Sequence, residues 1–278
     1  MEFLISILPA VYGRYPVISQ FIFSSPKICR AALLHCFTPL IWLYGKNSAV
    51  DLWVILTIGL APGLFWLWYF YSRDKYEPEP LSLIARMFFL GIVAAVIAFL
   101  LENLLISFVT TIIFVALVVP ALEEVLKFSM VALFIYRDKE FDEPMDGIVY
   151  ATATALGFAT LENIVYVLDI QTLSSLFLTG TLRAVLSVPG HALFAIFWGY
   201  SLGIAKFMPA DSRRTIVIVG GLVLAIGVHG IFNLMLEQEY AGLAIALLVL
   251  LPVVWWGAEK KIRAALLGCG SHETTESI

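Results

Sequence analysis

The sequence predicts an all-α protein, a polytopic bundle of transmembrane helices with about 7–8 membrane crossings. Its 278 residues are 61% hydrophobic and only 14% charged, whereas a soluble domain carries about 25% charged residues. Apolar runs long enough to cross a bilayer as a helix recur along the chain, and the period-two alternation of a membrane β-barrel is absent. We therefore expect a multi-pass protein of the cell membrane, with the lipid bilayer as a partner.

Residues 1–50 are expected to form an N-terminal extension. They mix apolar pieces with Arg14, Lys27 and Arg30, and the apolar run at 29–44 is somewhat short for a span. We interpret that run as an interfacial or partly inserted helix. The start of the chain lacks the basic and apolar regions of a cleaved signal peptide, and three scattered cysteines form neither a disulfide framework nor a metal site.

Residues 51–258 are expected to form the transmembrane domain, followed by a polar C-terminal tail at 259–278. The first span, 51–72, is rich in Trp and Tyr at its far end, as is typical of an interface belt. The later spans are expected at 86–104, 106–136, 147–169, 172–207, 215–236 and 240–258. Asp146 precedes the fourth of these spans and is expected to cap it.

Two spans are expected to be irregular. Segment 106–136 is too long for a helix that stands perpendicular to the membrane, so a tilt or a bend at Pro120 is expected. Segment 172–207 is interrupted by Pro189-Gly190. We interpret it as one passage that is broken or re-entrant at this dipeptide.

The distribution of Lys and Arg supports that interpretation. Basic residues cluster at 73–86, 137–139, 206–214 and 260–263. All four clusters fall on one side of the membrane only if the broken segment makes a single net crossing, and the positive-inside rule then makes that side cytoplasmic. No basic stretch suggests nucleic acid, and the net charge of −4 is too small to indicate a partner.

The most informative feature of the spans is a pair of adjacent glutamates, Glu123 and Glu124, in an otherwise apolar run. Carboxylates at bilayer depth cost roughly 2.5–3.5 kcal/mol each on insertion scales, so they are rarely without a role. Adjacent carboxylates repel and favour a shared proton, which suits a proton acceptor. Lys127 lies four residues after Glu123 and shares its helix face, whereas Glu124 is turned by about 100°.

Other spans each contribute a small polar group: Glu162 and Asn163, Arg183 and His191, and His229 and Asn233. Each group alone has an ordinary structural explanation as an ion pair, a buried hydrogen bond or a contact between helices. Their convergence on separate helices favours a functional site instead. Glu102 and Asn103, near the end of the second span, are interpreted as interfacial.

These residue types suit amide hydrolysis. A carboxylate can activate water, while histidines or a metal stabilise the oxyanion. Alternatively, His191 and His229 could hold Zn²⁺ as a His₂Glu set that keeps an open water position. Glu162 or the Glu123–Glu124 pair would supply the carboxylate. The usual H-E-x-x-H motif of zinc peptidases is absent.

Two other classes stay open at this point. Buried Glu, Lys, Arg and His also build proton relays, so a proton- or ion-coupled transporter is one alternative. The absence of inverted repeats and the adjacent placement of the two glutamates argue against it. The other alternative is a non-catalytic scaffold or immunity-type membrane protein, in which the polar groups only specify packing.

Five blocks of the sequence, four of them on separate spans, resemble blocks of the PrsW-type intramembrane proteases and occur in the same order along the chain. Residues 123–127, E-E-V-L-K, resemble the family's E-E-x-x-K, and residues 158–163 resemble its F-x-x-x-E-N. The D-E-P-M-D-G loop at 142–147, the P-G-H-A stretch around His191 and the helix carrying His229 resemble the remaining blocks. The likeness covers roughly 50–258.

The resemblance implies a membrane-embedded protease, with 51–258 as its protease domain, that makes the first cut in a membrane-anchored substrate such as an anti-sigma factor. Glu123, Glu124 and His191 match positions that the family needs for catalysis. With the convergence described above, the expected catalytic residues are Glu123, Glu124, Glu162, His191 and His229. The expected supporting residues are Lys127, Asn163, Arg183 and Asn233. The expected metal is Zn²⁺, held by His191, His229 and Glu162.

The PrsW family is distantly related to the CAAX-prenyl protease and bacteriocin-immunity group, and this chain departs from that group at two positions. Lys127 stands where an Arg one residue further on is usual, and Glu162 replaces the histidine of F-x-x-x-H. A prenylated substrate is therefore not expected. The sequence does not decide whether Glu123 or Glu124 is the base.

Overall fold

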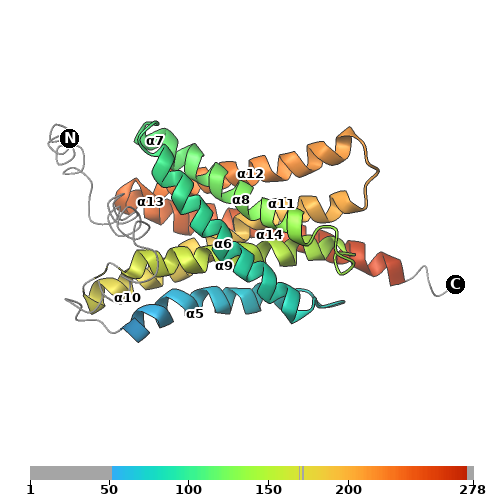
Figure 1. Ribbon diagram of the computed structural model, residues 1–278, viewed down its shortest axis with the longest axis horizontal. Helices are drawn as coiled ribbons and strands as arrows, with labels where there is room; N and C mark the ends of the chain where they lie inside the picture. Colours follow the sequence, from blue (N-terminus) through green and yellow to red (C-terminus); the bar gives the residue numbers. More distant parts are fainter. Residues whose placement is uncertain (1–51, 169, 171, 274–278) are drawn as a thin grey trace.

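The structure, a computed structural model, describes residues 52–168, 170 and 172–273, and all regular secondary structure in these residues is helical. The α-helices are α5 (Leu52–Tyr71), α6 (Leu81–Leu105), α7 (Thr111–Ile113), α8 (Val119–Phe134), α9 (Pro144–Leu168), α10 (Leu173–Leu182), α11 (Val188–Lys206), α12 (Ser212–Leu236), α13 (Glu239–Ile245) and α14 (Leu251–Glu273). Three π-helical segments join some of them: η1 (Phe114–Val118), η2 (Arg183–Ser187) and η3 (Ala246–Leu250). The elements form one elongated bundle (Figure 1). The predicted extension at 1–50 lies outside the described residues.

Six helical stretches among the described residues are long and apolar enough to cross a membrane. They are α5, α6, α9, the α10–α11 run, α12 and the α13–α14 run. A further stretch of comparable length, from α7 through η1 to α8, carries Glu123, Glu124 and Lys127. The all-α fold class and the expected number of crossings are confirmed, and the protein is a multi-pass membrane protein.

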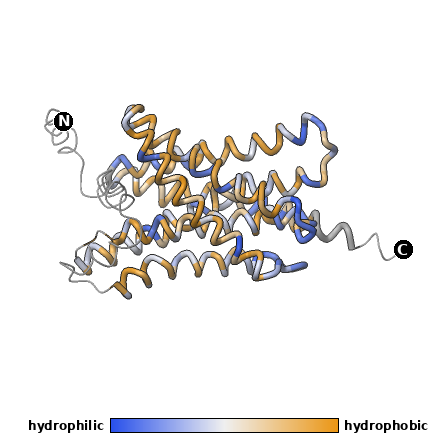
Figure 2. Tube along the Cα trace, in the orientation of Figure 1, coloured by the Kyte–Doolittle hydropathy of each residue, from blue (hydrophilic) through white to orange (hydrophobic). Residues whose placement is uncertain are grey.

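Helices α9 and α11 form the centre of the bundle. Their side chains are buried without interruption over 145–160 and 188–199. Gly147 and Gly199 lie where these two helices meet, and a Cβ atom on either one would collide with the backbone of the other helix. The small residues therefore let the two backbones approach closely, as is common between membrane helices. The outer helices α5 and α12 instead expose large apolar side chains, as expected of a lipid-facing surface. Figure 2 shows that the trace of α12 carries mostly hydrophobic residues.

Each π-helical segment lies directly before a proline. Segment η1 precedes Pro120, η2 precedes Pro189 and η3 precedes Pro252. Proline has no N–H group, and its ring clashes with the carbonyl four residues earlier, so one turn of the helix widens. The bend expected at Pro120 and the break expected at Pro189-Gly190 both take this form, and these two irregular turns, η1 and η2, are each followed by candidate site residues.

The basic clusters lie at one end of the bundle, where the α5–α6, α8–α9 and α11–α12 connections also lie (Figure 1). Arg73 pairs with Glu259 at 2.6 Å, and Lys206 donates a hydrogen bond to the carbonyl of Tyr136 at 3.0 Å. These contacts join clusters that are far apart in the sequence. The α10–α11 run therefore crosses the bundle once, as expected, while the cytoplasmic position of this end stays a prediction.

Several helix boundaries differ from the expected ones, and two of the differences concern predicted features. Asp146 lies in the first turn of α9 and not at its cap, and its carboxylate accepts hydrogen bonds from the backbone N–H groups of Asp142 and Glu143 at 2.7 and 2.6 Å. Helix α14 continues to Glu273, past the expected end of the last span at residue 258. Both differences have one cause: α9 begins before, and α14 ends after, the apolar run from which the helix was predicted.

Candidate active site

Helix α8 supplies three charged side chains to the interior of the bundle. The ammonium group of Lys127 lies 3.0 Å from Oε2 of Glu123 and 2.9 Å from Oε1 of Glu124. All three residues are at least nine-tenths buried, and Glu124 and Lys127 are completely buried. The expected i, i+4 pair between Glu123 and Lys127 is present, and the i, i+3 contact brings Glu124 to the same ammonium.

His191 enters this group from α11, in the first turn after η2. Its Nδ1 atom lies 2.9 Å from Nζ of Lys127, and its Nε2 atom lies 2.7 Å from Oε2 of Glu162. Because a carboxylate has no proton to give at that distance, the ring proton belongs on Nε2. Nδ1 therefore carries the lone pair and accepts from Lys127.

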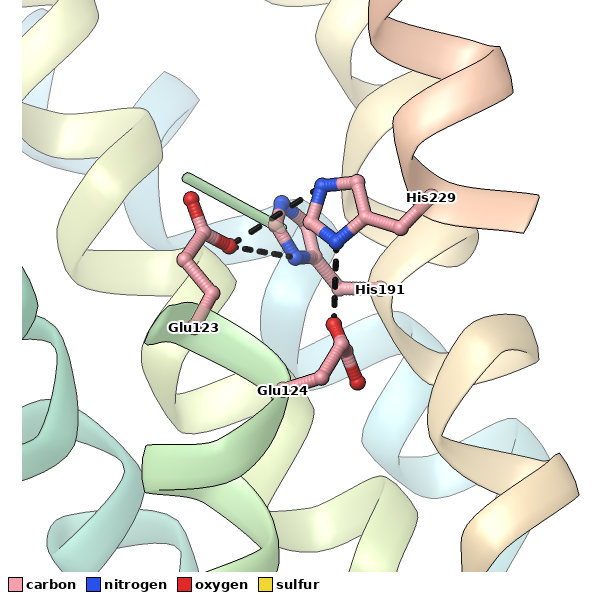
Figure 3. Close-up of side chains that lie close together, drawn as sticks. All are labelled: Glu123, Glu124, His191 and His229. Carbon is pink, nitrogen blue, oxygen red and sulfur yellow. Dashed lines mark hydrogen bonds and ion pairs between the residues drawn. The ribbon is translucent and has the colours of Figure 1, made fainter. Parts of the chain in front are cut away.

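His229 completes the group from α12. Its Nδ1 atom lies 3.0 Å from Oε1 of Glu124, and its Nε2 atom lies 4.0 Å from Oε2 of Glu123. The imidazole stacks on Phe194 with ring centroids 4.9 Å apart. The neighbouring Gly230 packs against the carbonyl of Ala116 in η1, where a larger residue would collide. This close approach holds His229 over the two glutamates (Figure 3).

A second layer of polar residues surrounds His191. Arg183, at the start of η2, pairs with Glu162 at 3.3 Å and donates from Nε to Asn163 at 2.9 Å. Asn163 in turn donates to the carbonyl of Gly59 in α5 at 3.0 Å. Glu162 is thus held between a guanidinium group and an imidazole, and the chain of contacts fixes the orientation of the His191 ring.

The ninth expected residue, Asn233, lies one turn after His229 on α12. Its side-chain amide donates to the carbonyl of Val115 in η1 at 3.4 Å. It therefore ties α12 to the irregular turn that precedes the two glutamates. The structure brings eight of the expected residues into one connected cluster, and Asn233 lies beside that cluster as a support for the helix.

Two residues of the site were not expected. Trp198 on α11 donates from its indole nitrogen to Oε2 of Glu124 at 2.9 Å. It lies seven residues after His191, a spacing that puts both side chains on one helix face and could have indicated the contact. Glu102, which we interpreted as interfacial, has a buried Oε1 atom without a hydrogen-bond partner and interacts electrostatically with Glu123, Glu162 and Lys127.

Four of these residues, from three helices, have the arrangement of a metal site. Glu123, Glu124, His191 and His229 can each offer one ligand atom, and these atoms all lie within 4.8 Å of one another. Two nitrogen and two oxygen donors suit Zn²⁺. Glu162 lies outside this set, on the far nitrogen of His191, where metal-bound histidines usually meet a carboxylate. The residues therefore fit a divalent ion.

Buried carboxylates beside paired imidazoles inside a membrane bundle are the groups that a membrane-embedded hydrolase uses. The comparisons with known proteins narrow this class. The chain matches the family described as PrsW family intramembrane metalloprotease over residues 79–257, a range that contains every site residue described above.

Curated relatives give the same result. The chain is 38% identical to Protease PrsW of Geobacillus kaustophilus over 76% of its own length and 92% of the relative. It is 35% identical to Protease PrsW of Clostridioides difficile over 74% and 87%, and 34% identical to that of Bacillus subtilis over 77% and 96%. No solved structure matches the chain. The chain belongs to the PrsW family of intramembrane proteases, and it is a peptidase of the cell membrane that acts on a protein substrate.

Proposed function

We propose that this protease makes a first, site-1-type cut in a membrane-anchored protein such as an anti-sigma factor, using water activated by a glutamate. The observation that carries the proposal is the convergence of Glu123, Glu124, His191 and His229 from three helices in the buried interior. A substrate held in the membrane lies at the depth of such a centre between the apolar helices, whereas a soluble protein would first have to enter the bilayer.

We assign the role of general base to Glu123. The oxygens of Glu124 already receive three donors: Lys127 and His229 at Oε1, and Trp198 at Oε2. Among the described residues, the hydrogen bond to Glu123 comes from Lys127 at Oε2. Its other oxygen, Oε1, is therefore the carboxylate oxygen of the pair that is available to take a proton from water.

Glu124, His191 and His229 would hold the metal as the His₂Glu set, with Glu162 orienting His191. This arrangement keeps both predicted histidine ligands and assigns Glu162 to the supporting layer. A divalent ion held there supplies Lewis acidity toward a peptide carbonyl. Glu123 then removes the proton from water, and the buried surroundings exclude competing bulk solvent.

The proposal is tested by reconstituting the purified protein in liposomes with a single-pass membrane protein of the anti-sigma-factor type. We expect one cut, located by mass spectrometry, that a chelator abolishes and Zn²⁺ restores. The matched control substrate is the same protein without its transmembrane segment, which should stay intact. Equal cleavage of both substrates would contradict the proposal that the substrate must be anchored in the membrane. Full activity in the presence of the chelator would contradict the proposal that cleavage depends on a metal.

A further inference from the structure

The ammonium group of Lys127 is completely buried and lies within hydrogen-bond distance of three acceptors. It contacts Glu123 Oε2 at 3.0 Å, Glu124 Oε1 at 2.9 Å and His191 Nδ1 at 2.9 Å. An ammonium group has three N–H donors, so these three acceptors satisfy it fully. The ring of Phe158 covers a further side, with its centroid 4.1 Å from Nζ.

The same residues form the candidate metal site. Lys127 contacts three of the four residues that can offer ligand atoms. The fourth, His229, contacts Oε1 of Glu124, the same oxygen that Lys127 contacts. A zinc ion takes its nitrogen and oxygen ligands at about 2.0–2.2 Å. An ion at that distance from Glu124 and His191 would fall close to the position that Nζ now holds. The two cations would also repel strongly in a buried setting.

We propose that Lys127 is a built-in competitor of the metal: its ammonium group and a divalent ion occupy the same position in turn. The inference rests on the proposed metal-dependent function, and it adds a step to it. Before the ion binds, the lysine side chain must withdraw from the glutamates and His191. The lysine thus keeps the buried carboxylates compensated whenever the ion is away.

The structure also supplies a place for the withdrawn ammonium. Glu102 on α6 has a buried Oε1 atom without a hydrogen-bond partner, and Lys127 is one of the charges that act on it. An unpartnered buried carboxylate oxygen is unusual, because most such atoms in folded proteins are paired. Glu102 is therefore the acceptor to which Lys127 turns when it releases Glu123, Glu124 and His191.

The test is the affinity of the purified protein for Zn²⁺, measured by competition with a fluorescent chelator. Lys127→Met removes the competing charge and should tighten binding by about tenfold or more. Glu102→Gln removes the alternative acceptor and should weaken binding several-fold, but only while Lys127 is present. When Lys127→Met is already present, adding Glu102→Gln should leave the Zn²⁺ affinity unchanged. A double-mutant cycle of the two substitutions measures this coupling directly.

Lys206→Met is the matched control, since Lys206 is a partly buried lysine that bonds to the carbonyls of Tyr136 and Asp138 at the end of the bundle, away from the candidate metal site. Its affinity should equal that of the wild type. If Lys127→Met is not monodisperse, Lys127→Gln takes its place. Equal affinities in the wild type and the Lys127 variant, or no binding by either, would overturn the inference.

Cleavage is recorded separately in the same preparations. The expected order of affinities without any cleavage would support the competition and overturn the proposed function. Metal-dependent cleavage, together with equal Zn²⁺ affinities of the wild type and the Lys127 variant, would support the proposed function and overturn the competition. The two ideas therefore fail on different readouts.

Discussion

In the part of the chain that the structure describes, buried carboxylates gather in two places that differ in their partners. In the middle of the bundle, Glu123 and Glu124 share the ammonium of Lys127 and face the imidazoles of His191 and His229. Each partner there is a cation or a group that can bind one. The ammonium of Lys127 lies 3.0 Å from Glu123 and 2.9 Å from Glu124, so the acidic groups of this place have a basic partner in direct contact.

The second place lies at the loop end of the bundle, around the α5–α6 connection. Asp74 and Glu79 are 4% and 5% exposed. Glu79 accepts a hydrogen bond from the hydroxyl of Tyr150. Burial, followed by the nearby Glu143 and Glu79, raises the pKa of Asp74 to about 7, and burial also raises the pKa of Glu79.

The comparison shows that burial alone does not make a carboxylate catalytic. At the loop end, the neighbours are a phenol and other carboxyl groups, and burial raises the pKa of both Asp74 and Glu79, which favours the neutral form of these acids. In the middle of the bundle, a lysine and two imidazoles keep charge and lone pairs available for chemistry. Substitutions that remove charge or donors should therefore affect activity in the first group and only stability in the second.

The largest expected effect is on the two glutamates of α8. Glu123→Gln and Glu124→Gln should each reduce cleavage by about 10²–10⁴-fold, the range for loss of a general base or a group that holds the site together. The two should differ in thermal stability, because only Glu124 accepts from Lys127, His229 and Trp198 together. A lower melting temperature for Glu123→Gln than for Glu124→Gln would reverse our assignment.

Glu162 should have the next largest effect. It orients His191 through a 2.7 Å contact with Nε2, and loss of such a second-layer partner typically reduces metal affinity or activity about 10–100-fold. We therefore expect Glu162→Gln to lower both quantities, measured by chelator competition and cleavage. Glu79→Gln is the matched variant at the loop end, and it should change neither. A cleavage defect in Glu79→Gln would remove the distinction between the two groups.

The two groups of carboxylates can also be compared through their hydrogen-bond donors, Trp198 in the middle of the bundle and Tyr150 at the loop end. Trp198→Phe leaves Oε2 of Glu124 without its indole donor, and a lost hydrogen bond to a buried charge costs about 1.5–3 kcal/mol of stability. We expect lower thermal stability and reduced cleavage. Tyr150→Phe removes the hydroxyl from Glu79 and should lower stability while cleavage stays at the wild-type level. Unchanged cleavage in Trp198→Phe would show that Glu124 is not part of the reacting group.

The smallest expected effect is a pH dependence at the loop end. The pKa of Asp74 is about 7 in the folded protein, against an ordinary value of 3.8. Between these values the folded state holds a proton that the unfolded state has lost, so stability falls as pH rises through this window. Asp74→Asn should remove a difference on the order of 2 kcal/mol. The check is the melting temperature from pH 5 to pH 8, and parallel curves for the two proteins would contradict the raised pKa.

Much of this architecture could be predicted from the sequence, because a membrane helix can be recognised from the length and the apolar composition of its segment. The prolines at 120 and 189 correctly indicated irregular helices, and the basic clusters correctly required a single crossing for the α10–α11 run. The exact form, a π-helical turn before each proline, depends on packing around that turn and is not encoded in a local pattern.

The candidate site could be predicted in part for a related reason. Charged residues in apolar spans stand out, so the glutamates, both histidines and Lys127 were all found. The electrostatic link between Glu102 and the site was not predicted, because the distance of a residue from the end of a span says nothing about which neighbouring helix covers it. Trp198 was overlooked because an indole in a membrane helix is ordinary, and only the fold shows that its N–H group points at Glu124.

The most direct test of the account is cleavage of a reconstituted membrane-anchored substrate by the Glu123→Gln/Glu124→Gln double variant. The matched control is Glu140→Gln, which removes a carboxylate that pairs with exposed Lys139 in the α8–α9 loop. We predict no cleavage by the double variant, wild-type cleavage by the control, and monodisperse protein in both cases. Retained cleavage by the double variant would show that peptide hydrolysis does not take place at this centre.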